Sequence, residues 1–131
     1  MKTIEELRSS LLKIGEQLGG GIRLNYYFTI PDQPDAFGTP YVKIHGNTYH
    51  FAANERGIEL IRNITLDYED ILYWFTDGGV RALASEFAAL NKSSHEAFRT
   101  LYFRKQFYLM LSIKPEWATR KKKEITHILI S

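Results

Sequence analysis

No cysteine occurs among the 131 residues of the chain, which excludes disulfide bridges and thiolate metal ligands. Long apolar runs are also missing, because no stretch approaches the roughly 20 residues that a membrane-spanning helix needs. Residues 1–18 mix acidic and apolar residues at helical spacing and lack the continuous apolar segment of a signal peptide. We therefore expect a soluble protein of the reducing cytoplasm that has no membrane partner.

A strong charge of one sign is also lacking, because the formal net charge at pH 7 is only +2. The charges are placed unevenly: residues 1–92 hold 9 Lys/Arg and 12 Asp/Glu, whereas residues 93–131 hold 8 and 3. Such asymmetry can steer a charged partner, or it can simply reflect the solvated faces of separate helices. The small net charge by itself does not indicate a nucleic-acid partner.

Length and composition predict one globular domain over residues 1–131, since hydrophobic residues make up 44% of the chain. A first helix is predicted after Thr3, a capping residue, and ends at the glycines 19–21. The β-branched and aromatic stretch 22–30 predicts a strand, and the segment 31–35 predicts a loop because its prolines cannot join a ladder.

A β-hairpin is predicted around Gly46-Asn47, because glycine accepts the positive φ at the first central position of a type II′ turn. This turn places Lys43 opposite His50 on one face, where the lysine charge disfavours protonation of the imidazole. The other face then carries the side chains of Val42, Ile44, Tyr49 and Phe51.

A second turn is predicted at residues 54–57, because the residue types there suit a type I turn. Glu55 and Arg56 then occupy its central positions, and Gly57 takes the left-handed conformation. Exposed charges are routine at such positions, so the turn by itself does not indicate a site.

The third predicted strand, residues 58–64, has a register that stays open by one residue. That one-residue slip decides whether Arg62 or Ile61 faces His50. An enzyme that uses His50 and Glu55 as acid and base is therefore the third interpretation of the chain, behind two binding functions.

Three helices are predicted after the strands. The first covers residues 67–91, and its glycine pair at 78–79 marks a kink, a break or close approach to another backbone. Residues 93–96 have the spacing of a capping box, and residues 98–113 are apolar almost all round, which predicts a central helix. Pro115 begins the last helix. The expected fold is α+β: an N-terminal helix, a small antiparallel β-meander, then three C-terminal helices packed together.

The last predicted helix carries a basic run at 120–123 on one side. The run covers little more than one helical turn, so its charges point in several directions instead of lining one groove. A small regulatory or nucleic-acid-binding module that uses the basic C-terminal helices is nevertheless the alternative interpretation. The opposite side carries Trp117, Ala118, Ile125, Ile128 and Leu129.

Motifs that carry catalytic or metal chemistry are not found in the chain. None of the four histidines shares the i, i+4 spacing of a zinc pair with another, and no G-x-S-x-G elbow occurs. The glycines after the first helix lack the spacing of a phosphate-binding loop. We expect no catalytic residue, no cofactor and no metal. The histidines are His45, His50, His95 and His127.

Several short motifs lie in order between residues 41 and 130. They are Tyr49-His50, Glu55-Arg56-Gly57, Asp70, Tyr73-Trp74, Ala84-Ser85-Glu86, Phe98-Arg99, Phe103, Lys105-Gln106, Pro115-Glu116-Trp117 and Arg120. In this order and spacing they resemble the immunity protein family 63 of bacterial polymorphic toxin systems. One departure is the glycine pair at 78–79, where the family pattern leads us to expect larger, helix-forming residues.

The resemblance implies a small cytoplasmic antitoxin that binds a cognate toxin domain and neutralises it by occlusion, without catalysis. Many motif residues serve equally well as scaffold. A nuclease toxin, basic because its substrate is nucleic acid, would favour an acidic surface on this protein. The candidate toxin contacts are His50, Glu55, Arg56, Glu69, Asp70 and Asp77.

Overall fold

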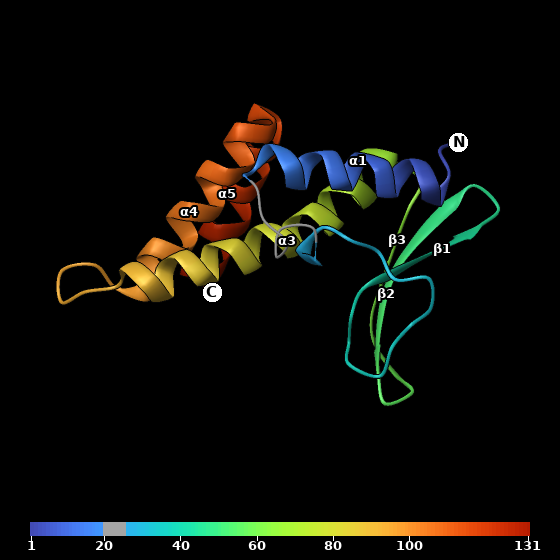
Figure 1. The fold of residues 1–131 in the computed structure, drawn as a ribbon, viewed down its shortest axis with the longest axis horizontal. Coiled ribbons are helices and arrows are strands. Elements are labelled where there is room, and N and C mark those ends of the chain that lie inside the picture. Colours follow the sequence, from blue (N-terminus) through green and yellow to red (C-terminus); the bar gives the residue numbers. More distant parts are fainter. Residues whose placement is uncertain (20–25) are drawn as a thin grey trace.

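The computed structural model describes residues 1–19 and 26–131. In this described part, one helix precedes a three-stranded antiparallel sheet and three helices follow it, which confirms the predicted α+β class. The sheet lies at the N-terminal end of the long helix α3, α4 lies along the part of α3 farther from the sheet, and α5 follows from the end of α4 (Figure 1). The elements are α1 (Ile4–Gln17), β1 (Tyr41–His45), β2 (Thr48–Glu55), β3 (Ile58–Thr65), α3 (Tyr68–Asn91), α4 (Phe98–Ile113) and α5 (Pro115–Ile130).

Helix α1 begins and ends as its sequence predicts. The Thr3 hydroxyl accepts a hydrogen bond from the backbone N–H of Glu6, at 3.1 Å, and so caps the first turn. After the last residue, Gln17, the chain reaches Gly19 with a φ of +111°; the two following glycines lie outside the described residues. The buried residues of the helix are Leu7, Leu11, Ile14 and Gly15.

The strand predicted over residues 22–30 is wrong where the structure describes it. Tyr26 and Tyr27 are helical and Phe28 lies in a turn, while residues 22–25 lie outside the described part. The Phe28 ring is 1% exposed and belongs to the core shared with α1 and α3. Burial of this ring, rather than strand pairing, decides the local conformation, as expected when packing overrides β propensity. The loop predicted at 31–35 is confirmed.

The glycine pair Gly78-Gly79 does not interrupt α3, which is continuous over its 24 residues. A Cβ atom added to Gly79 would lie 2.4 Å from the Phe28 ring, whereas one added to Gly78 would meet no atom within 4 Å. Of the predicted alternatives, the close approach is therefore the correct one, although the neighbour is a side chain and not a backbone. Gly79 gives the Phe28 ring its place against the helix.

Strands β1 and β2 pair in the predicted register. Val42 lies opposite Phe51 and Lys43 opposite His50. Gly46 has a φ of +59° in the connecting turn, as the predicted type II′ geometry requires. The Phe51 side chain packs edge-on against Phe75 of α3, with ring centroids 4.9 Å apart, so this face of the hairpin joins the core.

The turn between β2 and β3 is one residue shorter than predicted. Glu55 still belongs to β2 and pairs with Ile58, so the two central residues are Arg56 and Gly57, with φ values of +51° and +81°. Positive φ at both positions is the type I′ geometry, whose twist matches that of the flanking strands. Arg56 therefore holds a left-handed conformation that non-glycine residues rarely adopt.

The register of β3 resolves the choice that the sequence leaves open. Ile64 lies directly opposite His50, and Arg62 lies opposite Ala52. Arg62 is thus the diagonal neighbour of His50 on the same face, whereas Ile61 points to the other face. β3 is an edge strand of the sheet, and all its residues before Thr65 are exposed.

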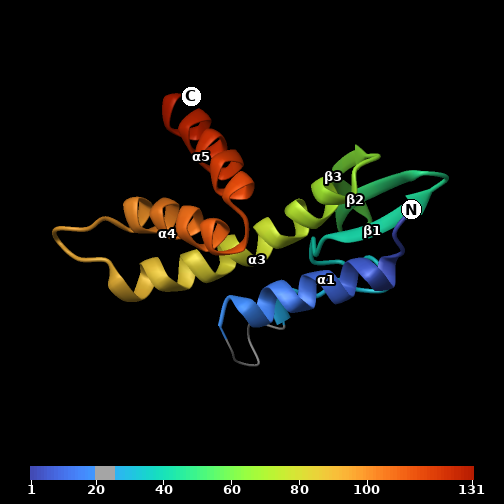
Figure 2. The same cartoon turned by 90° about the horizontal axis from the view of Figure 1, so that it is seen from above.

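Helix α3, and not α4, is the central helix of the fold. It packs against α1, the sheet and α4, as the two perpendicular views show (Figures 1 and 2). The prediction that α4 is central is wrong, because Leu101, Gln106 and Met110 are its only buried residues. An all-round apolar helix with one covered side leaves apolar area facing solvent.

Helix α4 also begins later than the capping box predicts. The Ser93 hydroxyl accepts hydrogen bonds from the N–H groups of His95 and Glu96, yet these residues form a separate turn. The first helical residue is Phe98, after Ala97, which provides no side-chain cap.

Candidate functional site

His50 lies in a small hydrogen-bonded network on the face of the sheet that points away from the core. An Arg62 guanidinium nitrogen lies 2.9 Å from Nδ1, and the Thr48 hydroxyl lies 3.3 Å from Nε2. The same hydroxyl donates to the carbonyl of His45, at 2.7 Å, so it accepts from the imidazole. This pattern assigns the proton to Nε2, leaves Nδ1 as an acceptor and makes His50 neutral.

The surroundings of His50 reinforce its neutral state. Desolvation lowers the pKa of His50, and the nearby His45 and Arg62 lower it further, while Glu59 acts in the opposite direction. The direction agrees with the sequence prediction, but the responsible cation is Arg62 and not Lys43. Arg62 is itself fixed by Glu59, with 2.6 Å between a guanidinium nitrogen and a carboxylate oxygen.

Glu55, Arg56 and Gly57 form the exposed tip of the β2–β3 hairpin. His50 is five residues from Glu55 on the same strand, which separates their Cα atoms by roughly 16 Å. These two residues therefore do not meet on one proton, and the geometry does not support the acid and base pair of the third interpretation.

The three acidic candidates on α3 are engaged in ion pairs with the C-terminal helices. Glu69 binds Lys114, with 2.7 Å between carboxylate oxygen and ammonium nitrogen. Asp70 accepts from a guanidinium nitrogen of Arg120, at 2.9 Å, and from the Thr65 hydroxyl, at 2.8 Å. The acidic part and the basic part of the chain thus neutralise each other along this junction.

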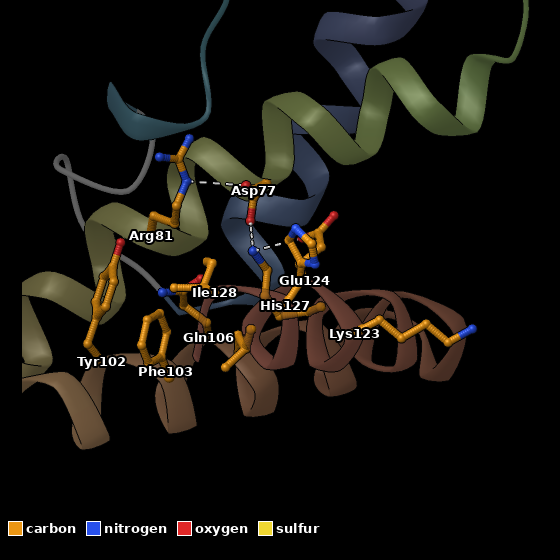
Figure 3. Close-up of a pocket in the computed structure, with 11 residues that line it drawn as sticks. Asp77, Arg81, Tyr102, Phe103, Gln106, Lys123, Glu124, His127 and Ile128 are labelled. Carbon is orange, nitrogen blue, oxygen red and sulfur yellow. Dashed lines mark hydrogen bonds and ion pairs between the residues drawn. The ribbon is translucent and has the colours of Figure 1, made fainter. Parts of the chain in front are cut away.

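Asp77 makes the most buried of these ion pairs. The Lys121 side chain is only 6% exposed, and its ammonium group lies 2.5 Å from one Asp77 oxygen and 3.1 Å from Glu124. The other Asp77 oxygen lies 3.2 Å from Arg81 (Figure 3). Lys121 therefore points inward, which corrects the prediction that the whole basic run lies opposite the apolar side of its helix. Two of the four cations in that run, Arg120 and Lys121, have carboxylate partners, which weakens the nucleic-acid interpretation.

Tyr73 and Trp117 fill the junction between these ion pairs. Their rings pack edge to face with centroids 5.5 Å apart, and both side chains are buried. The Tyr73 hydroxyl donates to Glu124, at 2.7 Å, and the Arg120 guanidinium lies over the Tyr73 ring. Burial strongly raises the pKa of Tyr73, and the hydrogen bond to Glu124 is the second largest cause of this rise. These two motif residues hold α5 to α3.

The other motif residues divide between the core and the surface. Tyr49 is buried, and its hydroxyl donates to the carbonyl of Lys2. Trp74 packs against Phe51, Glu86 accepts a hydrogen bond from Tyr27, and Pro115 occupies the first turn of α5. Phe98 and Arg99 are exposed at the start of α4, where the Arg99 guanidinium lies over the Phe103 ring.

A groove that the sequence does not predict opens between α4 and the C-terminal half of α5. We call it the α4–α5 groove; it has a volume of about 770 Å³. Its outer part is lined by Arg81, Tyr102, Phe103, Gln106, Lys123 and Ile128, and its inner end by Asp77, Lys121 and Glu124 (Figure 3). Figure 2 shows why it exists: α5 leaves the α3–α4 pair at a wide angle and its C-terminal end stands apart.

The residues at the end of α5 carried a signal that could have located this groove. Ile128 and Leu129 are predicted to share the apolar side of the last helix with the buried Trp117, but they are 48% and 55% exposed. Apolar residues that continue a helix beyond its packing partner indicate a surface that another molecule covers. Of the candidate contacts chosen for their charge, Asp77 alone lies in this groove, at its inner end.

Residues 1–19 and 26–131 also bear on two other functions, metal binding and membrane insertion. No group of three or more histidine, cysteine, aspartate or glutamate residues there could hold a metal ion. No helix in the same part of the chain is both long enough and apolar enough to cross a membrane.

Comparison with known proteins gives a family match. The family model described as immunity protein 63 matches residues 46–127, which is more than half of the chain. The match begins at the β1–β2 turn and ends in α5, so it includes β2, β3, α3, α4 and the residues that line the α4–α5 groove, except Ile128. No curated protein and no solved structure matches at a significant level.

Proposed function

The chain belongs to the immunity protein 63 family, and from this we propose that it is an antitoxin that binds a cognate toxin domain in the cytoplasm and neutralises it by occlusion. The family match is the observation that carries the proposal. An inhibitor of this kind needs a surface complementary in shape and charge to its target, and it needs no reaction of its own.

The exposed hairpin tip is one place where such a surface can form. Glu55 and Arg56 extend from it, and His50 lies on the adjoining sheet face. Contact between these residues and the toxin remains a prediction. Glu69, Asp70 and Asp77 remain predicted contacts as well, but each already has a basic partner within the protein, which reduces the charge that it offers to a toxin.

Co-expression tests the proposed function directly. The domain encoded at the C-terminal end of the neighbouring gene is produced in a bacterial host with and without this chain. We expect growth arrest without the chain, recovery with it, and co-purification of the two proteins. A neighbouring domain that is harmless, or one that stays toxic and unbound beside the intact chain, would show that the proposal is wrong.

A His50→Ala variant separates inhibition by binding from an enzymatic activity. Removal of a catalytic base lowers an enzymatic rate by roughly 10²–10⁴-fold. If the antitoxin acts by occlusion, the His50→Ala variant is expected to protect cells almost as well as the unchanged chain does. Loss of protection by a variant that is folded and still binds the toxin would favour the enzyme.

A further inference from the structure

Gln106 is an unpaired polar side chain at the α4–α5 groove. It extends from α4, is only 2% exposed, and its amide forms no hydrogen bond within residues 1–19 and 26–131. The side chain is almost fully covered, but its amide atoms still reach solvent through the groove. A group from a bound partner that enters the groove can provide that missing bond.

Apolar side chains surround this amide on both walls of the groove. Phe103 and Tyr102 line it from α4, and Ile125 and Ile128 line it from α5 (Figure 3). Two smaller hollows continue the same surface around Phe103, one toward Ile125 and one toward Leu129. The combined surface is apolar, concave and open to solvent.

The charge that is left over around this surface is positive. Asp77 and Glu124, the carboxylates of the groove, are both paired with Lys121. By contrast, Arg99, Lys122 and Lys123 form no ion pair within the described parts of the chain, and all three border the groove or its continuations. The surface therefore complements a partner that presents apolar side chains flanked by carboxylates.

We propose that the α4–α5 groove is the toxin-docking surface and that its occupant is an amphipathic helix of the toxin domain, with an apolar stripe flanked by Asp or Glu side chains. This inference rests on the proposed function and names the surface through which it acts. It places the principal contact on a basic groove among the C-terminal helices, away from the exposed hairpin tip at the outer end of the sheet (Figure 1).

A helix fits this groove better than an extended segment does. The walls are α4 and α5, with α3 at the inner end, and the backbone groups of all three are hydrogen-bonded within each helix, so they offer no edge to a strand. A helix satisfies its own backbone groups and presents side chains at i, i+3 and i+4 to the two walls.

A second copy of this chain is a poor occupant. Its own α5 carries the same unpaired cations, Lys122 and Lys123, which would repel those of the groove. Its acidic helix, α1, already buries its apolar stripe against α3. Nucleic acid is disfavoured as well, because the groove is lined with apolar side chains and its inner end holds Asp77 and Glu124.

Charge reversal at the rim tests the electrostatic part of the proposal. The test is the double variant Lys122→Glu, Lys123→Glu. The control is the double variant Lys13→Glu, Lys43→Glu, which makes an equal change of charge at exposed residues of α1 and β1. Binding of the inactivated toxin domain to the full chain is measured by calorimetry at two salt concentrations. We expect affinity to fall about tenfold or more for the first pair, mostly at low salt, and less than about twofold for the second.

Gln106→Leu tests the amide. Replacement removes an amide that makes no hydrogen bond within the described residues, so the midpoint of urea unfolding is expected to change little. Toxin affinity is expected to fall about tenfold, because the polar group of the toxin loses its partner. A purely structural role of Gln106 would instead change unfolding and leave affinity unaltered.

Ile128→Glu tests the apolar wall against a matched change. Leu12→Glu is the control, since Leu12 is 40% exposed on the surface of α1 and Ile128 is 48% exposed on α5. We expect an affinity loss of about tenfold or more for the first variant and less than about twofold for the second, with both variants folded.

The outcomes separate this inference from the proposed function. If the intact chain binds and protects but all three groove variants behave like it, the groove is not the docking surface and the antitoxin function stands. If the groove variants weaken binding of duplex DNA, or dissolve a dimer of this chain, while toxin binding is unchanged, the proposed occupant is wrong. If the intact chain neither binds nor protects, the proposed function itself fails.

Discussion

The two halves of α5 have similar composition and opposite environments. Residues 115–121 are fixed to α3 by the Trp117 side chain and by ion pairs, whereas residues 122–130 stand away from the other helices (Figure 2). Cations and apolar residues occur in both halves. The contacts that α3 makes with α5, and not the residue pattern within α5, therefore decide which half of α5 is buried.

The reason lies in the order of charges along α3. Acidic residues meet the first half of α5 at Glu69, Asp70 and Asp77. One turn beyond Asp77, the next charged residue is Arg81, a cation. An ion-pair row cannot continue past that point, and the second half of α5 is left with unpaired lysines and uncovered apolar side chains.

Trp117→Ala should have the largest effect on this comparison. Removal of a buried tryptophan leaves a cavity and costs about 3–5 kcal/mol, a large fraction of the roughly 5–15 kcal/mol that stabilises a typical domain. Ile128→Ala, at the half-exposed end of the same helix, should cost less than about 1 kcal/mol. Urea unfolding followed by circular dichroism measures both. Equal losses would mean that the second half is packed in solution.

Lys121→Met should cause the next largest loss of stability. It leaves Asp77 without its most buried partner, and breaking a buried pair costs about 3–5 kcal/mol, reduced here because Arg81 still contacts that carboxylate. Adding Asp77→Leu should restore most of the loss, since the buried carboxylate is then gone and the groups that lose a partner, Arg81 and Glu124, are partly exposed. Lys122→Met, one residue further, should change the free energy of unfolding by less than about 0.5 kcal/mol. A failure of the double variant to recover stability would contradict the ion-pair explanation.

The pH dependence of stability should show the raised pKa of Tyr73. The folded state retains the tyrosine proton above the ordinary pKa of about 10, whereas the unfolded state releases it. Stability therefore falls as pH rises above about 10, by up to about 1.4 kcal/mol per pH unit from this group. Tyr73→Phe should remove that slope and Tyr108→Phe, an exposed tyrosine of α4, should not. Identical alkaline slopes in the two variants would refute the assignment.

Glu69→Gln should have the smallest effect. The Glu69 side chain is 51% exposed and its Lys114 partner 37%, so the pair contributes less than about 1 kcal/mol and is screened by salt. Urea unfolding at low and high salt should show a small loss at low salt that disappears at high salt. A loss as large as that of Lys121→Met would mean that exposure does not rank the three ion pairs.

Patterns of short range determined much of this structure. The cap of α1, the β1–β2 register, the type II′ turn and the start of α5 at Pro115 follow from a few neighbouring residues, and the structure confirms them. The order of motifs also predicted the family that the comparison found. The β3 register was ambiguous by a single residue, so the sequence could not decide it, and the β2–β3 turn was predicted as type I but is type I′.

Long-range packing decided the rest. Phe28 is buried against Gly15 and Gly79, from two different helices, so its segment does not form the strand that its residues favour. The acidic side chains of α3 look like a free surface in the sequence because nothing local shows that Lys114, Arg120 and Lys121 reach them.

Knowledge of the candidate surface likewise comes partly from the sequence and partly from long-range packing. Sequence alone determined a small α+β protein of this family, with an acidic part and a basic part, because composition and motif order are properties of the chain. Only the tertiary structure decided that these parts neutralise each other along α3 and that an apolar, basic groove remains beside Gln106. Opposite charges pair, and apolar surfaces cover each other, only where they lie close in space. Which groups lie close together is set by how the helices cross.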